Sequence, residues 1–322
     1  LIGNQKFHSI KVLKLQYNPI MNKLSNNQHL VSIIMNCYNG ETYLNESIKS
    51  VLDQNYKNWE LIFWDNKSSD KSAQIFKTYN DSRLKYYHAP KHTLLYEARN
   101  QAIEKASGSF IAFIDTDDFW EKDKLELQIP LFKDSDVGVV YGNLYVLNEI
   151  LNTKKIFLKK KPKGFILNDL LKNYCTGLVT LVIRKSFLDN HKTVFDNSFH
   201  IMGDFDLMIR MSAKYKFDCV EKPIATWRVH GKNESLLHKT KQIQELKIWK
   251  KKMINYPVIF NNKNFANIDN MINNLEVINL ILENDLEKAK TKIKKMPYSL
   301  KKMKYIMALL LPNNFVKRFI QF

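Results

Sequence analysis

Two kinds of apolar segment alternate along this chain, and their alternation predicts the fold class. Short apolar, β-branched runs typical of buried strands alternate with longer segments whose apolar residues recur at helical spacing. The strand-like runs are 31–35, 59–64, 84–87 and 110–114. Strands that alternate with helices predict a mainly parallel sheet with helices on both faces, so the expected fold class is α/β.

Polar clusters directly follow three of these strand-like runs. They occupy residues 36–39, 65–70 and 115–118. Parallel strands have their carboxyl ends at one edge of the sheet, and ligands bind at that edge. The three clusters are therefore expected to form one site.

The segment Asp115-Thr116-Asp117-Asp118 carries the strongest chemical signal. Three carboxylates this close together repel one another unless a cation lies between them. Carboxylate oxygens suit hard ions such as Mg²⁺ or Mn²⁺, which complete their coordination with water and substrate phosphates. A solvated acidic turn that caps a helix is the alternative, and the position of the cluster at a strand end favours the metal.

The length of the chain limits the number of domains, and its net charge indicates the kind of partner. The chain has 322 residues, enough for one large α/β domain and a smaller region. Lysine and arginine number 50 against 32 acids, and the net charge of +18 implies an anionic partner: nucleic acid, an anionic membrane or a phosphorylated substrate. We expect an extension over 1–29, a catalytic domain over 30–235 and a helical, basic region over 236–322.

The cysteines indicate neither a disulfide framework nor a zinc site. Cys37, Cys175 and Cys219 are far apart and lack CxxC spacing, so we expect reduced, mostly buried thiols, which fit a cytosolic compartment. Residues 1–30 show no secretory signal. The apolar run 306–311 is far shorter than the roughly 20 residues that a membrane span needs.

Several segments, taken in order, resemble the family 2 glycosyltransferases with the GT-A fold. The resemblance covers roughly residues 30–235, and its segments are individually weak but occur in the order and spacing of the family. The matching segments are VSIIMNCYN (31–39), SVLDQNY (50–56), ELIFWD (60–65), ARN (98–100) and GSFIAFIDTDD (108–118). The resemblance implies a GT-A sheet flanked by helices, with a C-terminal helical extension.

The resemblance also implies roles for residues that would bind the nucleotide. Tyr38 and Asn39 resemble the residues that contact the nucleobase and ribose, and Asp65 resembles the acid that pairs with the base, typically uracil. The family often continues this last motif as Asp-Asp-Gly-Ser, whereas this chain has Asp65-Asn66-Lys67-Ser68 and so departs at its second and third positions. Arg99 resembles a nucleotide or diphosphate contact, with a surface salt bridge as the alternative.

The implied cofactor is Mn²⁺ or Mg²⁺. Asp117 resembles the direct metal ligand, and Asp115 a neighbour of both the metal and the ribose. The segment Trp227-Arg228-Val229-His230 resembles an aromatic-Arg-x-His segment that closes over the diphosphate. His230 is a candidate metal ligand or phosphate contact, with a structural histidine as the alternative.

The acceptor side of the site is expected around Asp204. Family members commonly carry Glu-Asp-x-Asp/Glu before an apolar helix with an arginine; here Gly203 replaces the glutamate and Asp204 falls where the catalytic base belongs. Asp206 is interpreted as an acid in the first helical turn, and N-terminal capping is the alternative for both acids. A single base implies one displacement with inversion at the anomeric carbon. Trp120 is expected either in the acceptor pocket or in the core.

The C-terminal region combines lysines with apolar residues. Residues 288–304 contain eight lysines and no acid, and the apolar segment 305–311 follows. Beyond Pro312, four apolar residues share one helix face: Phe315, Val316, Phe319 and Ile320. This pattern predicts an element at a membrane surface, with a solvated helix packed on the catalytic domain as the alternative.

Together these features predict an inverting, metal-dependent hexosyltransferase that uses a nucleotide-sugar donor, a UDP-sugar, and a glycan or lipid-linked acceptor in surface polysaccharide synthesis. The expected place is the cytoplasm, peripheral on the inner face of the membrane, with no nucleic-acid partner because no RNA or DNA motif is recognisable. A nucleotidylyltransferase-like enzyme would need a glycine-rich basic loop after the first strand, unlike residues 36–40. A non-catalytic nucleotide-sugar-binding relative stays open because Asn66 and Gly203 depart from the family pattern.

Overall fold

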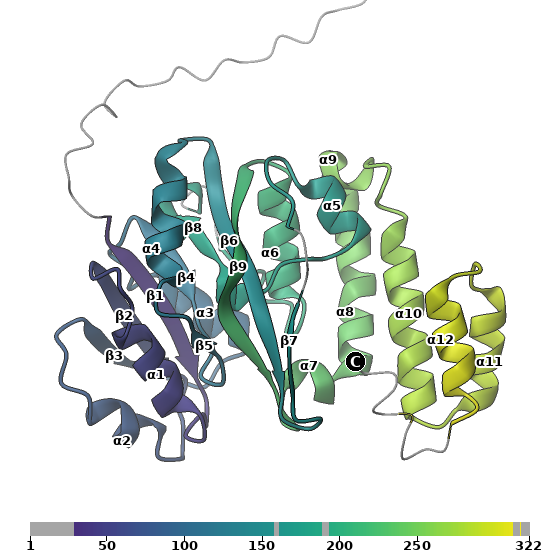
Figure 1. Ribbon diagram of the computed structural model, residues 1–322, viewed down its shortest axis with the longest axis horizontal. Helices are drawn as coiled ribbons and strands as arrows, with labels where there is room; N and C mark the ends of the chain where they lie inside the picture. Colours follow the sequence, from purple (N-terminus) through teal and green to yellow (C-terminus); the bar gives the residue numbers. More distant parts are fainter. Residues whose placement is uncertain (1–28, 158–160, 189–192, 312–315, 317–322) are drawn as a thin grey trace, which may run out of the picture.

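The computed structural model describes residues 29–157, 161–188, 193–311 and 316. In these residues one nine-stranded sheet is flanked by helices, and further helices extend the molecule on one side (Figure 1). The strand order is β3-β2-β1-β4-β8-β6-β9-β5, with β7 paired to β6. The predicted α/β class is confirmed.

The first half of the sheet is parallel, as predicted. Its strands are β1 (Val31–Cys37), β2 (Trp59–Asp65), β3 (Leu84–His88) and β4 (Phe110–Phe113). The helices between them are α1 (Leu44–Leu52), α2 (Ser72–Lys77) and α3 (Leu95–Ile103). The carboxyl ends of β1, β2 and β4 therefore lie at one edge and carry the three polar clusters.

The second half of the sheet is mixed. Its strands are β5 (Phe119–Trp120), β6 (Val137–Asn148), β7 (Thr153–Ile156), β8 (Val182–Arg184) and β9 (Lys216–Val229). β8 is antiparallel to β4 and β6, whereas β9 is parallel to β6. The sequence indicated only the end of β9, because Glu221-Lys222-Pro223 interrupts its apolar pattern where the register with β6 shifts.

Helices cover both faces of the sheet. α1, α2 and α4 (Lys124–Gln128) bury their apolar residues in one core, for example Ile48 and Phe76. α3, α5 (Leu167–Lys172) and α6 (Gly203–Ser212) bury theirs in a second core on the opposite face. Short 3-10 helices cover Ile129–Lys133, Leu178–Thr180, Lys185–Phe187 and Met253–Asn255.

The C-terminal region is helical, as predicted. Its helices are α7 (Glu234–Leu237), α8 (Lys239–Lys252), α9 (Pro257–Phe260), α10 (Asn267–Leu282), α11 (Leu286–Lys295) and α12 (Leu300–Ala308). α10 packs against α8 and α11 (Figure 1). The second core continues past residue 235 through Leu246 and Trp249 of α8, and a third core begins at Val277. The domain boundary at residue 235 stays a prediction.

Several other expectations concern the thiols and the membrane. Cys37, Cys175 and Cys219 are buried free thiols, as predicted. Among the described residues, no helix is both long and apolar enough to cross a membrane. The extension 1–28 and the tail residues Phe315, Phe319 and Ile320 lie outside the described residues.

Candidate active site

The three polar clusters come together at one edge of the sheet. The Asn39 side-chain oxygen accepts a hydrogen bond from the Ser69 amide at 2.8 Å, which ties the loop after β1 to the loop after β2. Gly40 lies so close to the loop after β4 that a Cβ atom there would be 2.7 Å from the Thr116 hydroxyl oxygen. Any side chain at position 40 would therefore push the first loop away from the Asp115–Asp118 segment.

Two buried polar groups at this edge lack a partner. Asn36 and Trp64 are paired in register on β1 and β2. Among the described residues, the side-chain amide of Asn36 and the indole nitrogen of Trp64 have no hydrogen-bond partner. Because buried polar groups are nearly always hydrogen-bonded, these two indicate that something else binds at this edge.

An exposed aromatic pair stands beside the clusters. The Tyr38 ring is 55% exposed, and its centroid lies 4.2 Å from that of the His92 ring. His92 Nδ1 donates a hydrogen bond to the Asn66 carbonyl at 3.0 Å, which fixes the imidazole. The sequence analysis missed His92, because a single histidine in a loop gives no pattern.

Asp65 lies at the expected strand end, but its carboxylate is buried. Its two oxygens accept hydrogen bonds from the Ser68 amide at 2.7 Å and the Tyr86 hydroxyl at 2.6 Å. Burial raises the pKa of Tyr86, and the neighbouring Asp65 carboxylate raises it further, so this hydroxyl stays protonated. Contact of Asp65 with a base stays a prediction, and it would have to use the lone pairs that Ser68 and Tyr86 leave.

Two of the three acids in the Asp115–Asp118 segment are bound to arginines. Asp115 forms an ion pair with Arg99 of α3 at 2.5 Å; the Asp115 side chain is 39% exposed and that of Arg99 only 5%. Asp118 is buried and accepts a hydrogen bond from the Arg228 amide at 2.9 Å. Burial raises the pKa of Asp118, and the charges of Asp117 and Asp115 raise it further.

Asp117 pairs with the predicted histidine. Its Oδ2 atom lies 3.0 Å from His230 Nε2 and 3.3 Å from the amide nitrogen of Asn233. The Lys232 amide donates to His230 Nδ1 at 3.2 Å, so Nε2 of a neutral imidazole carries the proton and donates it to Asp117. Asn233 could not be predicted from the sequence, because it lies outside the segment 227–230.

The residues around Asp117 fit a divalent ion only if the substrate supplies further ligands. No group of three or more His, Cys, Asp or Glu side chains in the described part of the chain is placed to hold a metal. Mg²⁺ and related ions are commonly bound by one or two carboxylates together with substrate phosphates and water. Asp117 and His230 match that arrangement, although His230 would need the other tautomer to bind through Nε2. The predicted ligand Asp115 is held by Arg99.

Arg228 fixes the acidic segment in place. Its guanidinium pairs with Glu46 of α1 and, at 2.6 Å, with Glu149 at the end of β6. Its Nε donates to the Asp117 carbonyl at 2.9 Å. Both acids are bound and only 6% of the Arg228 side chain is exposed, so Arg228 is engaged within the protein. Closure of the segment 227–230 over a diphosphate stays a prediction.

The candidate base Asp204 lies in the first turn of α6. Its Oδ1 atom accepts from the Phe205 amide at 2.8 Å and lies 3.3 Å from the Tyr96 hydroxyl. Its Oδ2 atom has no hydrogen-bond partner among the described residues. Burial raises the pKa of Asp204, and the positive charge of nearby Arg99 opposes that rise. One oxygen is therefore held while the other is available to a substrate.

Tyr96 explains why glycine occupies position 203. A Cβ atom on Gly203 would lie 2.6–2.7 Å from three atoms of the Tyr96 ring. The ring thus fills the space that the glutamate of the family pattern would enter. Its hydroxyl lies 3.0 Å from the Ile201 carbonyl, so Tyr96 also contacts the segment that leads into α6.

Two residues of α8 hold the start of α6. Glu245 is buried, and its carboxylate accepts hydrogen bonds from the amides of His200, Ile201 and Met202 at 2.8–3.0 Å. The Trp249 indole donates to Asp206 at 3.1 Å. The sequence analysis missed Glu245, which lies more than forty residues beyond the segment it binds.

Asp206 and Trp120 are structural. Asp206 is buried and pairs with Arg210 at 2.7 Å, so it links α6 internally and to α8. Trp120 is buried in the first core, where its indole nitrogen donates to the Val179 carbonyl at 2.9 Å. Of the two expectations for Trp120, the core position is the one found.

Known proteins with similar sequences are glycosyltransferases. The sequence model of the family described as glycosyl transferase family 2 matches residues 32–212. A UDP-Glc:alpha-D-GlcNAc-diphosphoundecaprenol beta-1,3-glucosyltransferase (WfgD) of Escherichia coli is 41% identical over 162 residues, covering 50% of this chain and 62% of that protein. A putative teichuronic acid biosynthesis glycosyltransferase (TuaG) of Bacillus subtilis is 32% identical, covering 50% and 64%. The match thus spans less than two thirds of either relative.

Solved structures support the fold. The S. aureus TarS fragment 1–349 has a TM-score of 0.60 at 15% identity and covers 90% of this chain and 81% of its own. The mannosyltransferase PcManGT from Pyrobaculum calidifontis, solved with GDP-Man and Mn²⁺, has a TM-score of 0.59 at 15% identity and covers 90% and 84%. The fold is GT-A, as predicted. Because the family match covers more than half of the 322 residues, the chain belongs to glycosyltransferase family 2.

Proposed function

We propose that this chain is a metal-dependent glycosyltransferase that moves a hexose from a UDP-sugar to a glycan or lipid-linked acceptor in surface polysaccharide synthesis. The relatives named above for a UDP-glucose donor, a lipid-linked acceptor and teichuronic acid synthesis support this choice. The observation that carries the proposal is the position of Arg99. It pairs with Asp115, and its guanidinium carbon lies 5.4 Å from the ring centroid of Tyr96, whose hydroxyl lies 3.3 Å from Asp204, so the two sides of the site meet at one buried guanidinium.

The donor half comprises the residues at the ends of β1, β2 and β4. In the proposal, Tyr38 offers an exposed ring for stacking of the base, and Asn39, Asp65 and Asp115 contact the nucleoside. Arg99 contacts the nucleotide with a fixed positive charge that suits a diphosphate. Asp117 and His230 are the residues that would hold Mn²⁺ or Mg²⁺, which would stabilise negative charge on the leaving diphosphate.

The acceptor half comprises Asp204 and the residues that hold it: Tyr96, Gly203 and Glu245. In the proposal, the free Oδ2 atom of Asp204 takes the proton from the acceptor hydroxyl. The hydroxyl oxygen forms a bond to the anomeric carbon as the bond from that carbon to the diphosphate oxygen breaks. One carboxylate base and one displacement invert the anomeric configuration.

Donor hydrolysis tests the proposal without knowledge of the acceptor. The full chain is incubated with UDP-sugars and Mn²⁺, and released UDP is measured with and without a chelator. We expect metal-dependent UDP release that falls about 10²-fold or more in Asp117→Ala, since one transition-state charge stabiliser is typically worth that much. Asp136→Ala, which changes an exposed acid directly before the start of β6, is the control. No UDP release from any donor, with UDP binding retained, would identify a non-catalytic relative instead.

Contact with an anionic membrane is part of the proposal. α12 exposes Leu300, Met303 and Met307, Leu310 is exposed directly after it, and lysines flank this apolar stripe. Apolar residues beside lysines favour binding at an anionic lipid surface. Flotation with anionic vesicles should recover the chain and lose it in Leu300→Glu/Leu310→Glu; equal recovery of both proteins would remove the membrane from the proposal.

A further inference from the structure

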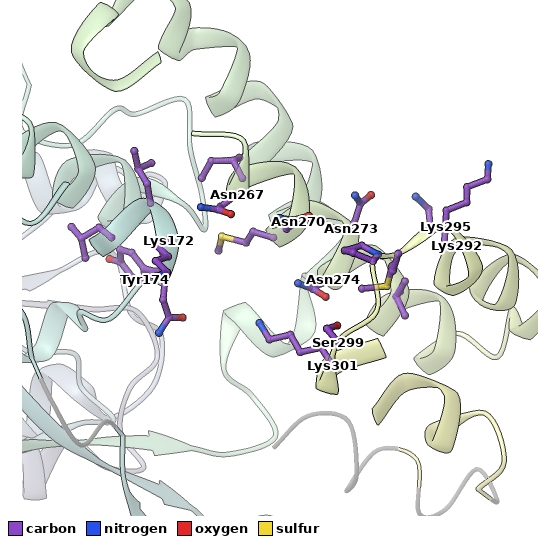
Figure 2. A pocket seen from close by; sticks show the side chains of 18 residues that line it. Lys172, Tyr174, Asn267, Asn270, Asn273, Asn274, Lys292, Lys295, Ser299 and Lys301 are labelled. Carbon is purple, nitrogen blue, oxygen red and sulfur yellow. The ribbon is translucent and has the colours of Figure 1, made fainter. Parts of the chain in front are cut away.

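A cavity of about 610 Å³ lies outside the residues assigned above, between the end of α5, one face of α10 and the connection from α11 to α12. This volume is typical of small-molecule sites, which range from about 300 to 1,000 Å³. Figure 2 shows the asparagines of α10 between Lys172 and Tyr174 on one side and Lys292 and Lys295 on the other. No acidic residue is among the described residues that line it.

The asparagines of α10 are the first evidence for a ligand. Asn267, Asn270, Asn273 and Asn274 line the cavity from one helix. Asparagine is a poor residue for a helix interior, so helix stability does not account for Asn270, Asn273 and Asn274, whereas Asn267 is the first residue of α10. Within the described chain, the side-chain amides of Asn267, Asn270 and Asn273 bind no other residue. Each amide can donate and accept hydrogen bonds, as the hydroxyl groups of a sugar require.

The lysines indicate that the ligand is anionic. Lys292 is neutralised by Glu276 at 2.5 Å. Lys172, Lys295 and Lys301 line the same cavity and have no acidic partner in the part of the chain that the structure describes. Lysines without an acidic partner at the border of one cavity give it a positive charge, which favours an anionic ligand.

The inner end of the cavity reaches the acceptor half. Tyr174 lines the cavity, and its ring centroid lies 5.1 Å from that of Phe205, the residue after Asp204. Burial raises the pKa of Tyr174, and the Asp204 carboxylate raises it further. Tyr174 therefore links the lining of the cavity to the helix turn that carries the candidate base.

The outer end of the cavity borders the apolar stripe of α12. Ser299 and Lys301 line the cavity, while Leu300 between them is 85% exposed. A ligand that occupied the cavity could thus extend an apolar chain along α12 without leaving the protein surface.

We propose that this cavity binds the phosphate-bearing glycan of a lipid-linked acceptor: the asparagines bind sugar hydroxyls and the unpaired lysines bind the phosphates. The inference rests on the proposed function and says where the acceptor of that reaction binds. The reactive sugar then lies toward Tyr174 and Asp204, and the lipid lies toward α12.

Calorimetric titration tests the cavity directly. The full chain is saturated with UDP to fill the donor half and titrated with an N-acetylglucosamine 1-diphosphate bearing a short alkyl ester, with the alkyl glycoside that lacks the diphosphate, and with inorganic pyrophosphate. We expect the glycosyl diphosphate to bind at least about tenfold tighter than either of the others, because charged and hydroxyl contacts act together. Equal binding of the glycosyl diphosphate and the alkyl glycoside would overturn the assignment of the lysines, and equal binding of pyrophosphate would overturn that of the asparagines.

A pair of matched variants assigns the binding to the cavity. Lys172→Gln/Lys295→Gln removes two of the unpaired lysines and should weaken binding of the glycosyl diphosphate about tenfold, since two charge-assisted hydrogen bonds are lost. Lys288→Gln/Lys290→Gln removes the same charge from lysines of α11 that pair with Asp285 and Glu287, and should bind as wild type does. Equal binding by both variants would overturn the proposal. UDP release from the donor is measured separately, so its presence or absence decides the proposed function and not the cavity.

Discussion

The donor half and the acceptor half of the candidate site are held in different ways. The donor half lies at the ends of adjacent parallel strands, and its charges are bound to one another: Asp115 to Arg99, Asp117 to His230 and Asp118 to the Arg228 amide. The acceptor half depends on helices that pack from elsewhere in the chain, because Tyr96 of α3 and Glu245 of α8 hold the turn with Asp204. Substitutions in α8, far beyond the matched region, should therefore damage only the acceptor half.

Among substitutions that should affect one half of the site and not the other, Glu245→Gln is expected to have the largest effect. The Glu245 carboxylate now accepts hydrogen bonds from backbone N–H groups. The NH2 group of a glutamine would face one of these N–H groups and could not accept its hydrogen bond, so the start of α6 must shift. A displacement of about 1 Å can cost about 10²-fold in rate, and we expect kcat for sugar transfer to fall about 10–10²-fold. The KM for the UDP-sugar and the UDP-induced thermal shift should stay unchanged.

A matched control for this variant is Glu283→Gln, which changes an exposed glutamate at the end of α10. It should transfer sugar as wild type does. If Glu245→Gln instead raised the donor KM in step with the loss of kcat, the two halves would not be separable and the comparison would fail.

An intermediate effect is expected from Gly203→Ala. Its Cβ atom would collide with the Tyr96 ring, and overpacking of this kind costs about 1–3 kcal/mol of unfolding free energy. In a Tyr96→Ala background the collision is absent, and the higher helix propensity of alanine should make the same change neutral or stabilising by up to about 1 kcal/mol. Urea unfolding of the four proteins measures this coupling. The same loss in both backgrounds would show that Tyr96 does not explain the glycine.

The smallest effect is expected from Tyr96→Phe, which keeps the ring and removes the hydroxyl. The Tyr96 hydrogen bond lowers the pKa of Asp204, so its loss should raise that pKa. The base acts as a carboxylate, and therefore the acid limb of the pH profile of kcat should move to higher pH, with about 0.5–1.5 kcal/mol lost in stability. Tyr79→Phe, which removes a hydroxyl bound to Asn45, should leave the profile in place. If the acid limb of the kcat profile did not move in Tyr96→Phe, protonation of Asp204 would not control the rate.

The sequence predicted the fold and the edge of the sheet where the polar clusters meet, because apolar strands that end in polar residues indicate both. The family resemblance suggested the roles of Tyr38, Asp65, Arg99 and Asp117, and these roles stay predictions. Glu245 and Tyr96 could not be chosen that way, because their roles arise from contacts between segments distant in sequence. The burial of Asp65 and the pairing of Arg228 with Glu46 and Glu149 likewise depend on tertiary packing.

The contact between Gly203 and Tyr96 has a consequence for engineering. In this chain, the ring of Tyr96 from α3 fills the space next to the base. In the family pattern, the glutamate before the base fills it. A chimera that imports the segment 200–210 from a relative with that glutamate would place two bulky groups in one space. Exchanging α3 together with the segment 200–210 would bring the matching neighbour of the glutamate, so these two segments should be transplanted together.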